Sequence, residues 1–236
     1  MAKKKYFIVI DTETTQTDKV ADFGAVVCDK QGRIVKECGV LVADFYTDRE
    51  KHPLFHMGDF LGGAANLPRR YEEYNQMLVD GRRMLASVAA VNRWLARVNA
   101  EYSPVMTAYN LAFDRGKMRN SGIDCDQFSE SFCLWHAAAE KWGATRRYRQ
   151  FILDNHYIGN RTQGGHMGYQ TKADAMAKFL LGPEYPDEPH TALEDARDYE
   201  VPILARLVKN TSPKIYMNPQ PYNWRNYALR DCFRPV

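Results

Sequence analysis

The feature that most constrains this chain is a short apolar run near its N-terminus that ends in acidic residues. Residues 6–10 are all aromatic or β-branched, and residues 11–15 are acidic or hydroxylic. A continuous apolar run of this length is typical of a central strand that is buried on both faces. Residues 21–28 and 33–42 are two further β-rich runs, and the segment between them ends in Gly32. So short a connection predicts a hairpin, and we expect three neighbouring antiparallel strands.

The rest of the chain alternates between helical and strand patterns. Apolar residues recur at helical spacing after Ser87, residues 104–109 and 132–135 indicate short strands, and helices are expected over residues 112–120, 171–181 and 192–208. Gly122 is expected to close the first of these three helices, and Pro202 to kink the last because it removes a backbone hydrogen bond. Residues 43–84 show no steady period and predict a long, loop-rich connection. The order of elements predicts an α/β fold.

Composition excludes several classes of protein. The 236 residues are 45% hydrophobic and 26% charged, which is typical of a globular domain and not of a disordered chain. No run of about 18 apolar residues occurs and the first residues do not fit a signal peptide, so we expect no membrane association and a cytoplasmic location. The net charge of +3 identifies no partner by itself. The cysteines are odd in number and widely spaced, so we expect reduced thiols in the core: Cys28, Cys38, Cys125, Cys133 and Cys232.

Asp11 and Glu13 stand two residues apart where the first predicted strand ends. Because alternate residues of a strand point to the same face, their carboxylates are expected side by side. Two like charges at a buried strand end are tolerable where a divalent cation neutralises them, and oxygen ligands suit Mg²⁺ or Mn²⁺. For the pair taken alone, a solvated strand end with an aspartate cap is the simpler explanation.

Two later segments carry further acids and a histidine that could join the first two acids in one site. Asp114 falls in the first turn of the helix that follows the strand at residues 104–109, and His190 precedes Asp195 by five residues. Four carboxylates can hold two divalent ions, which can together activate water, neutralise the transition state and stabilise the leaving oxygen in phosphodiester hydrolysis. A histidine with an ordinary pKa of about 6.5 can take the proton of the attacking water near neutral pH.

In order and spacing these motifs resemble the DEDD superfamily of 3′→5′ exonucleases, the DnaQ-like group of the ribonuclease H-like fold. The resemblance covers residues 6–208, and the distance from His190 to Asp195 is similar to that of the histidine subclass. It implies a mixed five-stranded sheet flanked by helices. It also implies that two Mg²⁺ or Mn²⁺ are held by four acids and that His190 is the general base. The acids are Asp11, Glu13, Asp114 and Asp195.

The resemblance implies that the chain hydrolyses phosphodiester bonds from the 3′ end of DNA, preferably single-stranded, and releases nucleoside monophosphates. The expected partner is therefore a nucleic acid with a single-stranded 3′ end. A 3′→5′ exoribonuclease of the same subclass is an open alternative, because nothing in the sequence is recognisable as a reader of the 2′-hydroxyl. A catalytically inactive nucleic-acid-binding or polymerase-associated module is an alternative of another class, and the complete set of acids with His190 argues against it.

Several further residues are candidate substrate contacts: Thr14, Asn110, Phe113, Arg146 and Arg147. Phe113 is expected either in the core, which is the simpler interpretation, or as a base-stacking platform. The two arginines belong to a basic cluster that either follows a phosphate backbone or forms a solvated helix face. Metal sites at His52 and His56, or at Cys125, Cys133 and His136, are not expected, because Pro53 interrupts the first set and the second lacks a fourth ligand.

Residues 1–208 are expected to form the exonuclease domain and residues 209–236 a basic, aromatic tail. The tail carries five basic residues against one acidic residue, and five aromatic rings stand among them. Rings and cations in this mixture suit single-stranded nucleic acid. The alternative is that the tail folds back and buries its rings on the core. Pro213, Pro219 and Pro221 argue against a long helix in either case.

Overall fold

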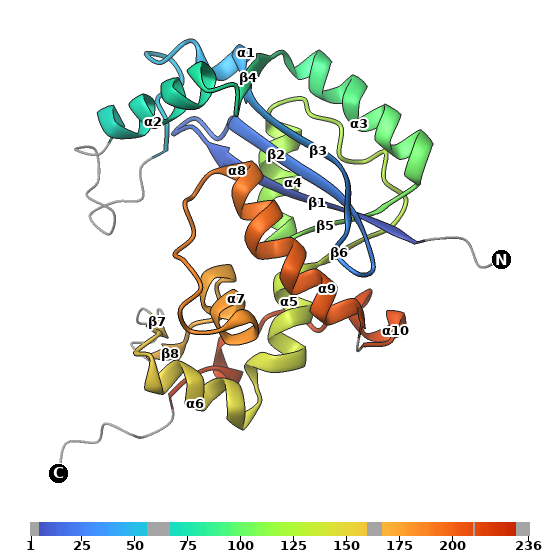
Figure 1. Cartoon of the computed structure of the whole chain (residues 1–236), viewed down its shortest axis with the longest axis vertical. Helices are drawn as coiled ribbons and strands as arrows, with labels where there is room; N and C mark the ends of the chain where they lie inside the picture. The colour runs from blue at the N-terminus through green and yellow to red at the C-terminus, as the bar shows by residue number, and fades with distance from the viewer. Residues whose placement is uncertain (1–4, 56–66, 160–166, 210, 230–236) are drawn as a thin grey trace.

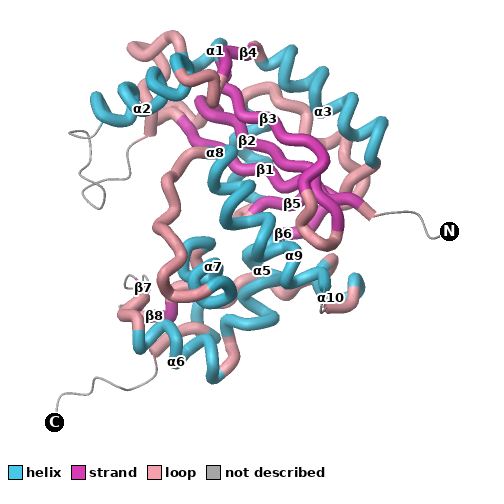
Figure 2. Tube along the Cα trace, in the orientation of Figure 1, coloured by secondary structure: helices cyan, strands magenta, loops and turns pink. Residues whose placement is uncertain are grey.

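The computed structural model describes residues 5–55, 67–159, 167–209 and 211–229, and its centre is a six-stranded sheet (Figures 1 and 2). The strands lie in the order β4 (Met84–Ala86), β3 (Ile34–Val42), β2 (Val20–Asp29), β1 (Tyr6–Thr14), β5 (Val105–Ala108) and β6 (Ser131–Cys133). β1 pairs antiparallel with β2 and parallel with β5, so the sheet is mixed. The α/β fold with a mixed sheet flanked by helices is confirmed. The expected five strands are six, because β4 pairs with β3 at the sheet edge.

β1 is longer than the apolar run that predicted it, and it includes both acids. Phe7 and Val9 belong to the core cluster on one face of the sheet, and Ile8 belongs to the cluster on the other face. By the two-residue period of a strand, Asp11 and Glu13 continue the face of Phe7 and Val9. The predicted hairpin between β2 and β3 is also confirmed.

Helices cover both faces of the sheet. α3 (Val88–Tyr102) and α4 (Leu111–Asn120) pack on the face of Ile8 through residues such as Leu95 and Met118. α3 begins where predicted, because the Ser87 hydroxyl accepts the N–H of Ala90 at 3.2 Å. α5 (Leu134–Ala138) and the helical stretch over residues 192–209 pack on the other face.

The connection between β3 and α3 is more regular than predicted. α1 (Ala43–Tyr46), α2 (Leu67–Val79) and β4 occupy much of the expected loop, and residues 56–66 lie outside the described part. Only Tyr74 and Met77 are buried on α2. Leu67, Tyr71, Tyr74 and Leu78 of α2 nevertheless recur at helical spacing and pack in one cluster, so the loop prediction missed a helical period that the sequence contains.

A smaller group of elements lies below the sheet in Figure 1. It contains η3 (Ala139–Gly143), α6 (Arg146–Asp154), β7 (Ile158–Gly159), β8 (Gly168–Tyr169) and α7 (Ala173–Leu181). α7 agrees with the predicted helix, whereas α6 and the small hairpin have no counterpart in the predicted order. The hydroxyl of Thr145 accepts the N–H of Tyr148 at 3.2 Å and so begins α6.

The last long helix has three parts: α8 (Ala192–Glu194), the π-helical η4 (Asp195–Glu200) and α9 (Val201–Lys209). Pro202 has no N–H to donate to the carbonyl of Asp198, four residues earlier. That carbonyl instead accepts a hydrogen bond from the Tyr185 hydroxyl at 2.7 Å. A wider π-helical turn thus directly precedes the position of the predicted kink.

The tail folds back onto the core over residues 211–229, and residues 230–236 lie outside the described part. It forms the short helices α10 (Pro213–Tyr216) and η5 (Trp224–Asn226). Tyr216 is 1% exposed, and its ring centroid lies 6.3 Å from that of Phe7 and 5.2 Å from that of Phe132. Tyr222 stacks on Tyr227 with centroids 4.8 Å apart. These rings are therefore packed in the protein and are not displayed on a free arm.

Four of the cysteines are free thiols. Cys28 and Cys125 are buried as predicted, whereas Cys38 and Cys133 are only partly buried, and Cys232 lies outside the described residues. Within the described ranges, no helix combines the length and the apolar character needed to cross a membrane.

Candidate active site

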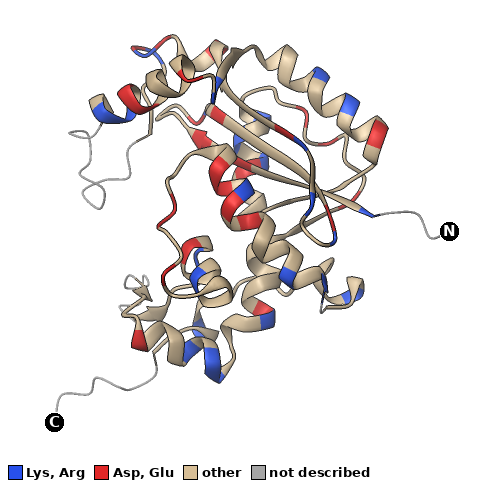
Figure 3. Cartoon of the chain, viewed as in Figure 1, with Lys and Arg blue, Asp and Glu red and all other residues tan. Residues whose placement is uncertain are grey.

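Acidic side chains gather where the carboxyl ends of β1 and β5 meet at one edge of the sheet. The two strands run parallel, so both deliver the residues that follow them to this edge. Asp11 and Glu13 lie near the end of β1 and are partly buried. Figure 3 shows further acidic residues along the start of the last long helix, beside this edge.

Asp114 comes to the same edge from the helix after β5. It lies in the first turn of α4 and is 3% exposed. Its carboxylate accepts a hydrogen bond from the hydroxyl of Thr12 at 2.8 Å. Because Thr12 stands between Asp11 and Glu13, this bond ties the acid of α4 to the strand that carries the other two.

Asp195 is delivered by a helix that lies very close to the sheet. Gly24 of β2 is paired with Asp11 on one side and with Gly39 of β3 on the other. A β-carbon on Gly24 would stand 2.2 Å from the backbone carbonyl carbon of Ala192, and one on Gly39 would stand 2.7 Å from the side chain of Leu193 in α8. The two glycines therefore allow α8 to rest on the strands, which places Asp195 next to the acids of β1.

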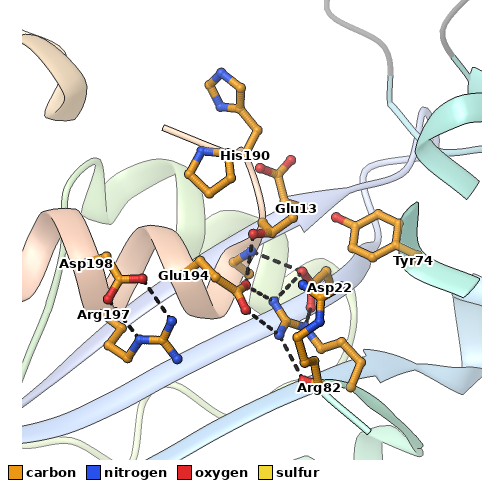
Figure 4. A network of polar contacts seen from close by, with 12 residues as sticks. Glu13, Asp22, Tyr74, Arg82, His190, Glu194, Arg197 and Asp198 are labelled. Carbon is orange, nitrogen blue, oxygen red and sulfur yellow. Dashed lines mark hydrogen bonds and ion pairs between the residues drawn. The ribbon is translucent and has the colours of Figure 1, made fainter. Parts of the chain in front are cut away.

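A buried ion-pair network fixes the start of α8 (Figure 4). The guanidinium of Arg83 lies between Asp22 and Glu194, with N–O distances of 2.8 and 2.5 Å. Asp22 also accepts the N–H of Ala192 at 3.0 Å, and Glu194 accepts the hydroxyl of Thr191 at 2.8 Å. Removing one partner from a buried pair of this kind costs about 3–5 kcal/mol, so the helix start is firmly held.

His190 precedes this anchored segment in a left-handed backbone conformation with φ of 58°, which is uncommon for a residue with a β-carbon. Its carbonyl accepts a hydrogen bond from Arg70 of α2, and Arg70 also pairs with Glu13 at 3.4 Å. Glu13, His190 and Asp195 each offer one ligand atom, and these atoms lie within 4.8 Å of one another. Residues far apart in the sequence thus converge at one site.

Burial and mutual repulsion disfavour the ionised form of the acids. Burial, with neighbouring acids adding to it, raises the pKa of Asp195 to about 10. Burial raises the pKa of Glu13 to about 8 although the Arg70 charge opposes it, and raises that of Asp114 to about 7. The pKa of Asp11 is also well above its ordinary range, first through burial and then through Asp114.

His190 experiences the opposite effect. Burial, followed by the charges of Arg70 and Lys172, lowers its pKa below the ordinary 6.5. The imidazole is therefore neutral near pH 7, and one ring nitrogen is free of a proton. A neutral imidazole can accept a proton or bind a metal ion.

The donor set fits a divalent cation. Oδ1 of Asp195 is buried and has no hydrogen-bond partner within the described residues. A buried carboxylate oxygen without a partner is unfavourable unless a cation compensates it. Carboxylate oxygens are the ligands that Mg²⁺ and Mn²⁺ prefer. His190 lies close enough to Glu13 and Asp195 to be either a base beside such an ion or one of its ligands.

Two further acids belong to this electrostatic environment and were missed by the sequence analysis. Glu200 is 2% exposed, accepts the N–H of Tyr109 at 3.1 Å, and raises the pKa of both Asp11 and Asp195. Glu188 has its own pKa raised to about 7 by burial and then by a neighbouring acid. Glu200 follows Asp195 by five residues, which in an ordinary α-helix places it on a different face. The π-helical turn, with its bonds from i to i+5, brings the two residues to the same side.

The candidate substrate contacts beside the acids have different environments. Phe113 is 43% exposed, with the ammonium of Lys117 4.8 Å from its ring centroid, so the expectation that it lies in the core is wrong. Asn110 is exposed and its side chain makes no capping bond to α4. Thr14 is buried. Phe113 and Asn110 therefore have surfaces available next to Asp114.

Arg146 and Arg147 are not brought to the acids. Both are exposed in the first turn of α6, which lies in the lower group of elements in Figure 1. The nitrogen Nδ1 of His52 lies 2.5 Å from the Thr17 hydroxyl, and His56 lies outside the described residues. Over the described ranges, Glu13, His190 and Asp195 form the one group of three or more such residues that could hold a metal ion.

No protein-family model matches the chain, and no curated protein matches it in sequence. Solved structures of exonuclease I are similar to it at 15% identity. One is E. coli exonuclease I in complex with a 5cy-dT13 oligonucleotide, with a TM-score of 0.47 over 89% of this chain and 41% of the neighbour. Another is exonuclease I in complex with the inhibitor BCBP, with a TM-score of 0.41 over 89% of this chain and 42% of the neighbour. The chain thus spans less than half the length of these proteins.

Proposed function

We propose that this chain is a metal-dependent 3′→5′ exonuclease of the DEDD superfamily, histidine subclass, and that it releases nucleoside monophosphates from single-stranded DNA. The observation that supports this most strongly is the convergence of Glu13, His190 and Asp195 within 4.8 Å, with Asp11 and Asp114 in the same electrostatic environment. Buried like charges of this kind destabilise a fold unless a bound cation compensates them, and a phosphodiesterase site provides that cation.

The acids that would hold two Mg²⁺ or Mn²⁺ are Asp11, Glu13, Asp114 and Asp195. When bound, these ions would supply Lewis-acid activation of water and stabilisation of the leaving oxygen. The protein contributes rigidity to this arrangement. Thr12 orients Asp114, and the network of Arg83 fixes the helix that carries Asp195.

His190 would accept the proton of the attacking water at an unprotonated ring nitrogen. Its lowered pKa supports this role, because the imidazole is neutral at the pH at which the water must lose its proton. On this basis His190→Ala slows the chemical step by about 10²–10⁴ while the acids still bind metal. If instead metal affinity collapses and saturating metal restores the single-turnover rate, His190 is a ligand.

The 3′ end of the substrate would lie against the exposed side chains beside Asp114. Phe113 offers a ring face on which a base can stack, and Lys117 beside it offers a cation for a phosphate. Asn110 offers an exposed amide that makes no capping bond to α4. Arg146 and Arg147 would contact only a more distant part of a longer strand.

The test uses 5′-labelled single-stranded DNA and RNA of the same sequence, with Mg²⁺ or with EDTA. We expect Mg²⁺-dependent shortening from the 3′ end with release of mononucleotides, and faster hydrolysis of DNA. Asp195→Asn abolishes turnover. Asp198→Asn is the matched control, because Asp198 is on the same helix and pairs with Arg197 at the surface.

Each alternative has its own outcome in this assay. Faster hydrolysis of RNA identifies an exoribonuclease of the same subclass. Binding of DNA without any cleavage in Mg²⁺ or Mn²⁺ identifies an inactive nucleic-acid-binding module. Cleavage that Asp195→Asn leaves within tenfold of the parent overturns the assignment of the site.

A further inference from the structure

One arginine of α2 contacts the acidic site, and it lies outside the three sequence motifs that predicted the site. Arg70 lies on α2, in the stretch that the sequence predicts as a loop. We propose that Arg70 is a positioning residue of the active site, which clamps Glu13 to the backbone of the His190 segment. This inference rests on the proposed function and adds to it a residue outside the three motifs.

The contacts of Arg70 reach both sides of the site. Its Nη2 lies 3.4 Å from the carboxylate of Glu13, and the same atom donates to the carbonyl of His190. Nη1 lies 3.5 Å from the carbonyl of Pro189. The guanidinium stands over the ring of Tyr74 at 5.3 Å, and Tyr74 is 1% exposed. One planar group thus joins the end of β1 to the segment before α8.

Arg70 stabilises the backbone at His190, which has an unfavourable conformation. His190 adopts φ of 58°, which the neighbouring structure must stabilise in a residue with a β-carbon. The carbonyl of His190 faces Arg70, whereas the residues after it are fixed by the Arg83 network. Arg70 therefore holds the N-terminal end of this segment, which the Arg83 network does not contact. With both ends held, the imidazole of His190 lies close to Glu13 and Asp195.

The side chain at position 70 needs the geometry of arginine. A fork of several N–H donors can bind one carboxylate and two carbonyls together, whereas a lysine ammonium is a point charge that cannot span them. The alternative role for Arg70 is direct contact with a substrate phosphate. A phosphate contact would add to binding and to its salt dependence, and a positioning contact would not.

The experiment compares Arg70→Ala and Arg70→Lys with Arg69→Ala in the full chain. Arg69 is the matched control, because it is the preceding residue on α2, is 78% exposed and pairs with Glu73 at the surface. For each protein we would measure kcat and KM on single-stranded DNA, the salt dependence of DNA binding in EDTA, and thermal unfolding. Unfolding identifies any variant that fails to fold, and Arg70→Lys, which keeps the charge, then decides the outcome.

We expect kcat to fall by about 10–100-fold in Arg70→Ala and by less in Arg70→Lys, as a misplacement of about 1 Å in the site would produce. KM and the salt slope should stay within the error of the parent and of Arg69→Ala. A salt slope lower by about 0.7 with a raised KM overturns the proposal in favour of a phosphate contact. Full activity of both Arg70 variants also overturns it. If the parent and Arg69→Ala are themselves inactive, the proposed function fails and this inference fails with it.

Discussion

The close approach of α8 to the sheet gives the sharpest prediction. Gly24→Ala adds one carbon atom beneath the helix that carries Asp195. That carbon would lie 2.2 Å from the backbone carbon of Ala192 and 2.3 Å from the N of Leu193, whereas ordinary contact begins at 3.4 Å. The opposing atoms are backbone, so no side-chain rotation relieves the clash. α8 must move away from the sheet by about 1 Å, or β2 must bend.

Two magnitudes follow from this displacement. Overpacking of this kind costs about 1–3 kcal/mol, and the upper end applies because two backbones meet. A shift of about 1 Å in Asp195 relative to Asp11 costs up to about 10²-fold in rate. We therefore expect Gly24→Ala to lower the free energy of unfolding by about 3 kcal/mol, and its kcat to fall about 100-fold in the fraction that is folded.

The assay is chemical unfolding together with exonuclease turnover at a temperature at which the variant is folded. Gly116→Ala is the matched control. Gly116 lies inside α4 and a β-carbon there meets nothing within 4 Å, so alanine should stabilise the helix by about 0.5–1 kcal/mol and leave turnover unchanged. Equal stability and turnover in Gly24→Ala and the parent would refute the idea that the glycine determines how closely α8 packs on the sheet.

Three further predictions follow from charge and burial. In the metal-free protein Glu13 and Asp195 keep protons that the unfolded chain has lost above about pH 4, so stability falls as pH rises from about 5 toward their raised pKa values of about 8 and 10. Unfolding titrations in EDTA should show this fall and saturating Mg²⁺ should remove it, whereas a rise with pH in EDTA would contradict it. Tyr216→Ala should cost about 3–5 kcal/mol by thermal unfolding, because the ring is 1% exposed, and no loss would show that the tail is not packed. Tyr216→Phe should be neutral or slightly stabilising, because the buried hydroxyl has no partner within the described residues, and a cost above about 1 kcal/mol would indicate a hidden partner.

The sequence was informative where a local period determines the structure. The two-residue period of β1 was enough to expect Asp11 and Glu13 on one face, and the strand-to-helix signal before Asp114 was enough to place that acid at the same edge. The cap at Ser87 fixed the start of α3. These features depend only on neighbouring residues, so they can be read from one chain.

The remainder depends on tertiary contacts that no short window of sequence contains. Glu200 joins the acids only because a π-helical turn changes which residues share a side of the helix. Arg70 joins them only because α2 packs against residues of β2 and β3, which are far from it in the sequence. Phe113 shows the opposite failure: its aromatic character predicted a core position, but it is exposed although its neighbour Asp114 is buried.

The central claim is that the acids at the end of β1 hold divalent cations for hydrolysis, and Mn²⁺ binding measured by electron paramagnetic resonance tests it most directly. We expect the parent protein to bind two Mn²⁺ with saturation, Asp198→Asn to bind the same number, and Asp195→Asn to lose at least one. Binding should release protons, because the carboxyls with raised pKa values must ionise to become ligands. Absence of saturable Mn²⁺ binding by the parent, or equal binding by Asp195→Asn, would contradict the account.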